Sequence, residues 1–223
     1  MSRGMMRSGN PALSKKTFEN LTNTSGGVMT LDGTVNKTAI SLCLLMLAAY
    51  YTYSKQDLSL IWPGFIGGLI VAVITIFKKE WSPITVPIYA VLEGLALGGI
   101  SAVYAHEYTG IVQQAIFLTF GIFCTLLFAY KTKVIKPTEN FKLGVFAATG
   151  GIAIVYLASF IMSMFGSGLS IMNPANSSLM SIGFSLFVVV IASLNLVMDF
   201  DFIEEVAESG APKYMEGYGA FGL

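Results

Sequence analysis

The chain has 223 residues, of which 54% are hydrophobic and only 12% are charged. Soluble domains usually contain about 25% charged residues, so this composition excludes an ordinary soluble globular protein and favours one with several membrane-spanning helices. Its 13 basic and 13 acidic side chains give no net charge, which excludes a bulk attraction to nucleic acid. The first expected partner is therefore the lipid bilayer.

Six apolar runs approach the roughly 20 residues that a helix needs to cross a bilayer. They occupy residues 38–53, 58–77, 84–104, 111–130, 143–165 and 179–198. Charged or turn-forming residues separate them. Residues 1–35 are polar and rich in Gly, Ser and Asn, so we expect a mobile tail there, followed by a transmembrane helical bundle over residues 36–223.

The chain after the sixth run changes character twice. An acidic stretch ends at Gly210-Ala211-Pro212, and residues 213–223 (KYMEGYGAFGL) are again aromatic and apolar. This pattern predicts an all-α polytopic membrane protein with six transmembrane helices plus the start of a truncated seventh. Without the rest of a central seventh helix, we expect the glycine face of Gly94 and Gly98 in the third run to be poorly packed.

Basic residues predict the orientation, because loops on the cytoplasmic side of a membrane are enriched in Lys and Arg. With the N-terminus in the cytoplasm, twelve of the 13 basic residues fall on the cytoplasmic side, and only Lys55 falls outside. This asymmetry predicts six crossings up to Met198.

Glu93 is the one ionisable residue well inside an apolar run. A carboxylate at the bilayer centre costs at least about 2.5 kcal/mol on insertion scales, so it usually faces a cavity or a partner. Two interpretations of Glu93 are open. In the structural one, Glu93 is protonated and hydrogen-bonded within the bundle. In the functional one, Glu93 is part of an ion or proton site.

Five acids in ten positions follow the sixth run directly. At 100° per residue, Asp199 shares a face with Asn195 and apolar residues, whereas Asp201 points to the opposite side with Glu204, Glu205 and Glu208. Asp201 therefore belongs to an acidic stripe that we expect to be solvated. Asp199 should turn into the bundle, where only a shared proton, hydrogen-bond donors or a cation such as Ca²⁺ would stabilise its charge. Asp201, Glu204 and Glu205 are secondary acidic candidates.

The chain lacks the motifs of common enzymes. Its only histidine is His106, and no nucleophile motif, phosphate loop, dinucleotide motif or His/Cys metal cluster is present. We expect neither catalysis nor a resident cofactor, and calcium only as a transported ion with Asp199 as a tentative ligand.

Two stretches resemble the transmembrane Bax-inhibitor-motif family, in particular its bacterial YccA-like branch. They are PIYAVLEGLALGGIS in the third run and LNLVMDFDFIEEVAESGAPKYMEGYGAFGL after residue 193, in which Asp199 takes the position of the family's aspartate at the end of helix 6. The resemblance implies six helices around a central seventh and a pH-sensitive calcium leak. It also implies a bacterial inner-membrane location and a carboxylate partner for Asp199 on helix 7, beyond Leu223. The basic residue that relatives carry in helix 2 is missing from residues 58–77.

Two functions follow as hypotheses. The first is a passive, proton-modulated pathway for calcium or other cations, with Asp199 as the proton sensor and Glu93 on or beside the path. The alternative is a regulatory membrane protein without transport activity, which binds and modulates a membrane protease or another membrane protein. The intramembrane acids favour the first hypothesis, and the long polar tail favours the second.

Overall fold

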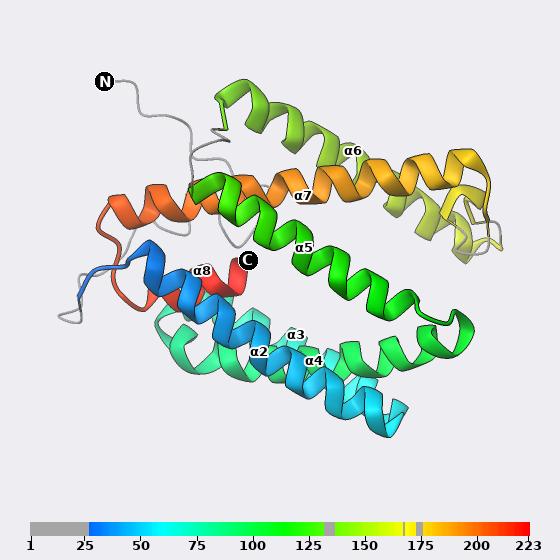
Figure 1. Cartoon of the computed structure of the whole chain (residues 1–223), viewed down its shortest axis with the longest axis horizontal. Helices are drawn as coiled ribbons and strands as arrows, with labels where there is room; N and C mark the ends of the chain where they lie inside the picture. Colours follow the sequence, from blue (N-terminus) through cyan, green and yellow to red (C-terminus); the bar gives the residue numbers. More distant parts are fainter. Residues whose placement is uncertain (1–26, 132–136, 167, 173–175) are drawn as a thin grey trace. The chain divides into compact units, whose positions relative to one another are not determined.

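A computed structural model describes residues 27–131, 137–166, 168–172 and 176–223 of the protein. Within these residues it contains seven α-helices, numbered α2 to α8, three short 3-10 helices and a single β-bridge between Val28 and Pro212 (Figure 1). The α-helices are α2 (Leu31–Lys55), α3 (Ile61–Phe77), α4 (Ser82–Glu107), α5 (Ile111–Lys131), α6 (Glu139–Met164), α7 (Leu179–Glu208) and α8 (Met215–Gly222).

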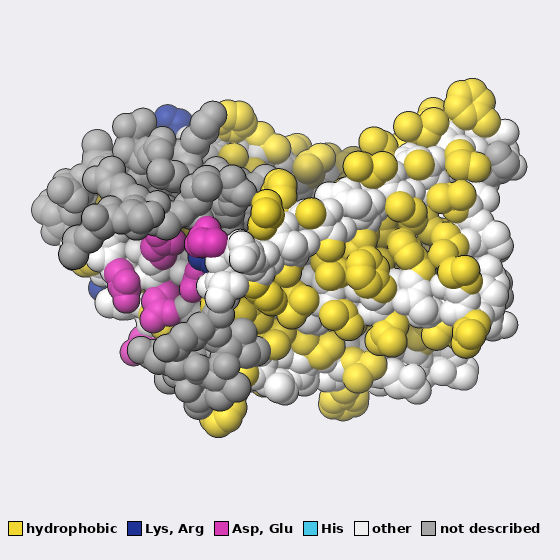
Figure 2. Space-filling view, turned by 90° about the horizontal axis from the view of Figure 1, so that it is seen from above, with side chains coloured by type: hydrophobic (Ala, Val, Ile, Leu, Met, Phe, Trp, Pro, Cys, Tyr) yellow, Lys and Arg dark blue, Asp and Glu magenta, His cyan; other side chains and the backbone are white. Residues whose placement is uncertain are grey.

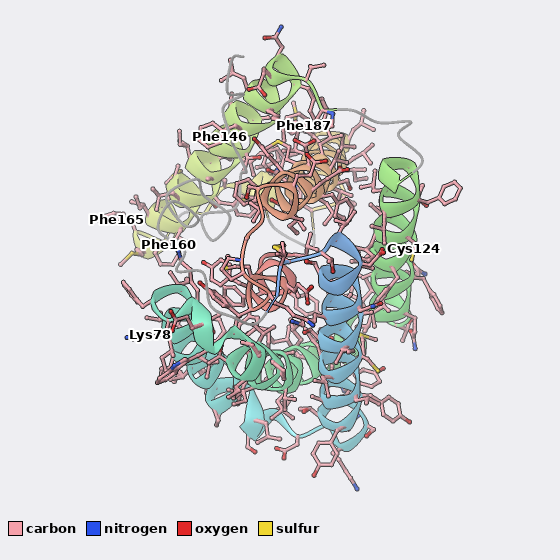
Figure 3. The ribbon with its side chains drawn as sticks, turned by 90° about the vertical axis from the view of Figure 1, so that its left-hand side faces the viewer. Lys78, Cys124, Phe146, Phe160, Phe165 and Phe187 are labelled. Atoms are coloured by element: carbon pink, nitrogen blue, oxygen red, sulfur yellow. The ribbon has the colours of Figure 1, made fainter. Side chains whose placement is uncertain are left out.

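The prediction of an all-α protein with six apolar spans is confirmed. Within the described residues, six helical segments are long and apolar enough to cross a membrane. Many large hydrophobic side chains on them are exposed, as lipid-facing side chains would be. Figure 3 shows two such side chains pointing outward, Phe160 on α6 and Phe165 directly after this helix. Most of the apolar run after Pro212 is also helical and forms α8.

Two helices, α2 and α7, extend furthest beyond the predicted runs. Helix α2 begins at Leu31 rather than residue 38, because Thr30 caps it by accepting a hydrogen bond from the Gly33 amide. Helix α7 continues ten residues past Met198 to Glu208, and the chain then turns at Gly210, whose φ is +79°. Hydropathy misses both extensions because charged residues interrupt the apolar pattern in each of them. Residues 1–26, most of the expected tail, lie outside the described residues.

The chain divides into two compact units. One comprises Ile122–Phe202, which includes the later part of α5, all of α6 and most of α7. The other comprises the described residues of Lys15–Gly121 together with Ile203–Leu223, and it includes α2, α3, α4 and α8.

In the second unit, glycines bring helix backbones together. A Cβ atom added at Gly94 or Gly98 of α4 would collide with the carbonyl oxygen of Leu45 or Ala49 on α2, respectively. On α3, a Cβ at Gly64 would lie 2.7 Å from the Leu92 oxygen of α4. The expectation that Gly94 and Gly98 are poorly packed is therefore wrong, because α2 fills the space beside them.

Helix α8 joins this bundle at the end where α2 begins and where α3 connects to α4. The Met29 amide donates to the Ala211 carbonyl (2.7 Å), and the Ser82 hydroxyl donates to the Tyr214 carbonyl (2.7 Å). The edge of the Tyr89 ring also meets Phe221 at a centroid distance of 5.0 Å. As a result, the polar start of α2 and the segment after α7 lie together (Figure 1).

In the first unit, side chains rather than close backbones connect the helices. Asn195 of α7 donates through Nδ2 to the Thr149 hydroxyl of α6 at 2.7 Å. The rings of Tyr156 and Phe184 lie 6.4 Å apart between the same two helices. The glycines of α6 have no neighbour within 4 Å of an added Cβ among the described atoms.

Candidate functional site at the acidic end of α7

The helical continuation of α7 fixes the directions of its acids. On the face of Asp199, the side chains of Phe202, Ile203 and Val206 are all buried, and Asp199 itself is only 8% exposed. Glu204 and Glu205 are partly exposed, and Glu208 is exposed. The prediction that Asp199 turns inward while the stripe from Glu204 to Glu208 turns outward agrees with this burial. Figure 2 shows acidic side chains gathered in one area, whereas hydrophobic side chains spread over much of the visible surface.

The expectation that Asp201 is simply solvated is wrong. Its carboxylate lies 2.6 Å from the Lys142 ammonium group of α6, and its side chain is only 26% exposed. Lys142 is itself buried, at 7% exposure, and also lies 3.6 Å from the exposed Glu139. A buried ammonium group needs a carboxylate partner, so Asp201 is part of an ion pair that joins the start of α6 to the end of α7.

Asn195 extends the polar surface of α7 one turn before Asp199. Its Nδ2 group donates to both the Thr149 hydroxyl and the Ile191 carbonyl, while Thr149 donates in turn to the Val145 carbonyl. Its Oδ1 atom is buried and accepts no hydrogen bond from the residues that the structure describes. Residues four apart on a helix are neighbours, so an amide oxygen and a carboxylate lie along one face of α7.

Glu93 lies on α4, in the other unit. A Cβ added at Gly68 of α3 would lie 3.0 Å from the Glu93 Oε2 atom, so this carboxylate faces a glycine of the neighbouring helix. Glu93 is partly buried. Glu93 and Asp199 therefore belong to different units of the chain.

The described residues contain no group of three or more His, Cys, Asp or Glu side chains that could hold a metal ion. The tentative assignment of Asp199 as a calcium ligand therefore has no preformed carboxylate cluster behind it in this part of the chain. Any cation beside Asp199 would need oxygen ligands of another kind, such as amide oxygens, backbone carbonyls or water.

Sequence reasoning missed two charged residues that the structure makes prominent. Lys142 was counted only as a loop charge, although its position directly before an apolar run placed it at a helix start. Glu216 of α8 is 3% exposed and lies 3.0 Å from Lys37 of α2. Glu216 is the single acid inside the run YMEGYGAFGL, and this isolation in an apolar sequence could have indicated a buried carboxylate.

The model of one protein family, described as Bax inhibitor 1 like, matches residues 10–223. The match covers all seven helices, both stretches that carry the resemblance and the acidic end of α7. No curated protein and no solved structure shows a significant match to the chain.

Proposed function

The chain belongs to the Bax inhibitor 1 like family, and from this premise we propose that it is a membrane protein that conducts cations passively under the control of protons. The observation that carries the proposal is the buried position of Asp199, which is 8% exposed near the end of an apolar spanning helix. The calcium ion is the proposed cargo, and the proposal involves no catalysis.

The physical reason concerns the free energy of a charge in an apolar environment. A buried carboxylate must be neutralised by a proton or stabilised by a cation or hydrogen-bond donors. Exchange between these states changes the local charge of α7, and such a change can shift an equilibrium between two helix packings. Asp199 is therefore the proposed proton sensor and a candidate contact for calcium.

The other acids have different proposed roles. Glu93 lies against a glycine of α3, where its carboxylate can border a path through the α2–α3–α4 bundle. Asp201 neutralises Lys142 and fixes the end of α7. Glu204 and Glu205 are more exposed and can attract cations to this end of the helix.

The test is calcium flux into liposomes that contain the full-length protein, measured between pH 6 and pH 8. Asp199→Asn should flatten the pH dependence, and Asp201→Asn should retain most of it. Glu93→Gln should change the flux more than its pH response. If Asp201→Asn flattened the profile and Asp199→Asn did not, the sensor assignment would be wrong. Absence of flux in every variant would favour the alternative function, the modulation of a membrane partner.

We also propose that the protein resides in a bacterial inner membrane with the start of α2 in the cytoplasm. The distribution of basic residues supports this orientation. Lys55 ends α2, whereas Lys213 lies beside the segment at the start of α2, because its amide donates to the Gly27 carbonyl. In a background without Cys43 and Cys124, an impermeant thiol reagent added to intact cells should label Lys55→Cys and not Lys213→Cys. Labelling of both positions would contradict this topology.

A further inference from the structure

The Glu216 carboxylate of α8 contacts three polar groups near the start of α2. Its Oε1 atom accepts hydrogen bonds from the Thr30 amide (3.2 Å) and the Thr30 hydroxyl (3.0 Å). Its Oε2 atom lies 3.0 Å from the Lys37 ammonium group. The carboxylate side chain is only 4% exposed, so these groups replace most of the water that an exposed carboxylate would bind.

The sequence at the start of α2 is suited to this carboxylate. The Thr30 hydroxyl accepts from the Gly33 amide while it donates to Glu216, so one residue caps α2 and binds α8. The partial positive charge of a helix start also favours a carboxylate there. A Cβ atom at Gly33 would overlap the Glu216 carboxylate, so an alanine at this position would displace that carboxylate from its present contacts.

We infer that Glu216, Thr30 and Lys37 form a charge-dependent clasp that holds α8 in the bundle while Glu216 is ionised and releases it when Glu216 is protonated. The inference is independent of the proposed role of Asp199. A protonated carboxyl group would lose its ion pair with Lys37 and one acceptor position, leaving a buried polar group poorly satisfied. The backbone contacts of Met29 with Ala211 and of Gly27 with Lys213 do not involve a titrating group, so release would affect α8 more than the segment before it.

The sign of the pH effect follows from the contacts. Burial alone raises the pKa of Glu216, but hydrogen bonds from Lys37 and Thr30 and the charge of Lys37 bring this pKa below the usual carboxyl value. A lowered pKa means that the clasp contributes fully at neutral pH and loses its contribution as the pH falls through the lowered value. Other charged residues on the elements packed against α8 take no part in the described contacts of Glu216: Asp32 and Lys55 on α2, Lys79 and Glu80 beside α4, and Glu93, His106 and Glu107 on α4.

The experiment follows the exposure of α8 directly. In the full-length protein with Cys43→Ser and Cys124→Ser, a cysteine replaces Ala220, which is 7% exposed. Its reaction with a disulfide reagent that remains active in acid is measured from pH 7.5 to pH 3.5. Each rate is divided by that of the same protein unfolded in SDS at the same pH.

At pH 7.5, Glu216→Gln should react about tenfold faster than the parent, the factor expected when a hydrogen-bonded charge is removed. The parent should approach the Glu216→Gln rate only in acid, and the rate of Glu216→Gln should change little with pH. Gly33→Ala should expose α8 at neutral pH without altering any charge. Gly144→Ala is the matched control, because no described atom lies within 4 Å of its added Cβ.

Lys37→Met gives a milder test, since the Lys37 side chain is 34% exposed and its replacement leaves Thr30 in place. It should raise the neutral-pH rate by less than Glu216→Gln does. If Glu216→Gln and Lys37→Met were both as protected as the parent at pH 7.5, the clasp would be overturned. The same conclusion would follow if the parent and Glu216→Gln showed identical pH profiles.

Discussion

Helices α4 and α6 both contain small residues four positions apart, yet the two pack in different ways. In α4, Gly94 and Gly98 lie directly against backbone carbonyls of α2. In α6, Ala147 and Gly151 have the same spacing, but no described atom lies within 4 Å of a Cβ added at Gly151. Helices α6 and α7 instead meet through Asn195 and Thr149 and through an ion pair. Small-residue spacing therefore permits a close helix contact without specifying one, and polar side chains connect helices where glycines do not.

The largest expected effect comes from replacing a packed glycine. Gly98→Val should lower the free energy of unfolding by about 3 kcal/mol, the upper part of the usual range for overpacking, because the carbonyl of Ala49 belongs to a helix backbone and cannot rotate away. The measurement is thermal or denaturant unfolding in detergent. Gly151→Val is the matched control and should change this free energy by less than about 0.5 kcal/mol. Equal losses for the two variants would remove the distinction between α4 and α6.

The second expected effect tests the ion pair of the first unit. Lys142→Met should destabilise the protein by about 2 kcal/mol, less than the cost of breaking a fully buried pair, because the Asp201 side chain retains 26% exposure. Chemical denaturation in the same detergent measures this loss.

The variant Asp201→Asn and the double variant complete a thermodynamic cycle for the pair. The double variant should recover part of the loss, because it leaves neither charge unpaired. Glu139→Gln should have a much smaller effect, since Glu139 is 57% exposed and lies 3.6 Å from Lys142. Additive effects of Lys142→Met and Asp201→Asn would show that the pair contributes no coupling energy.

The smallest expected effect concerns the hydrogen bond inside the apolar part of the α6–α7 contact. Asn195→Leu and Thr149→Val should show a coupling energy of about 0.6 kcal/mol in a double-mutant cycle, the average for hydrogen bonds between membrane helices. Stability in bicelles or detergent provides the measurement. A coupling energy of zero would mean that ring contacts such as Tyr156 with Phe184 hold these helices instead.

The sequence predicted those features that depend on hydropathy and helical period. The apolar runs located all six spans, and the 100° rotation per residue separated the buried Asp199 from the more exposed acids on α7. Hydropathy could not locate the first turns of α2 or the last ten residues of α7, because charged residues interrupt the apolar pattern there. Capping of α2 by Thr30 is a local contact that hydropathy does not measure.

Tertiary pairing was the part that the sequence did not reveal. Asp201 looked solvated because its neighbours on the helix surface are acids, and only the position of α6 shows that Lys142 reaches it. The packing of Gly94 was likewise assigned to a missing helix, although α2 occupies that place. A single sequence contains no signal for which of several suitable partners a side chain will meet.

The contact between Thr30 and Glu216 joins residues that are 186 positions apart, on either side of six spanning helices. During synthesis, Glu216 is therefore translated only after the whole intervening chain, so the N-terminal end of α2 exists for some time without this partner. Closing so long a segment is entropically unfavourable until the intervening helices have been inserted and restrict its ends. Protection of residues around Thr30 should consequently appear as one of the last events of assembly, although Thr30 is translated before all of the described helices.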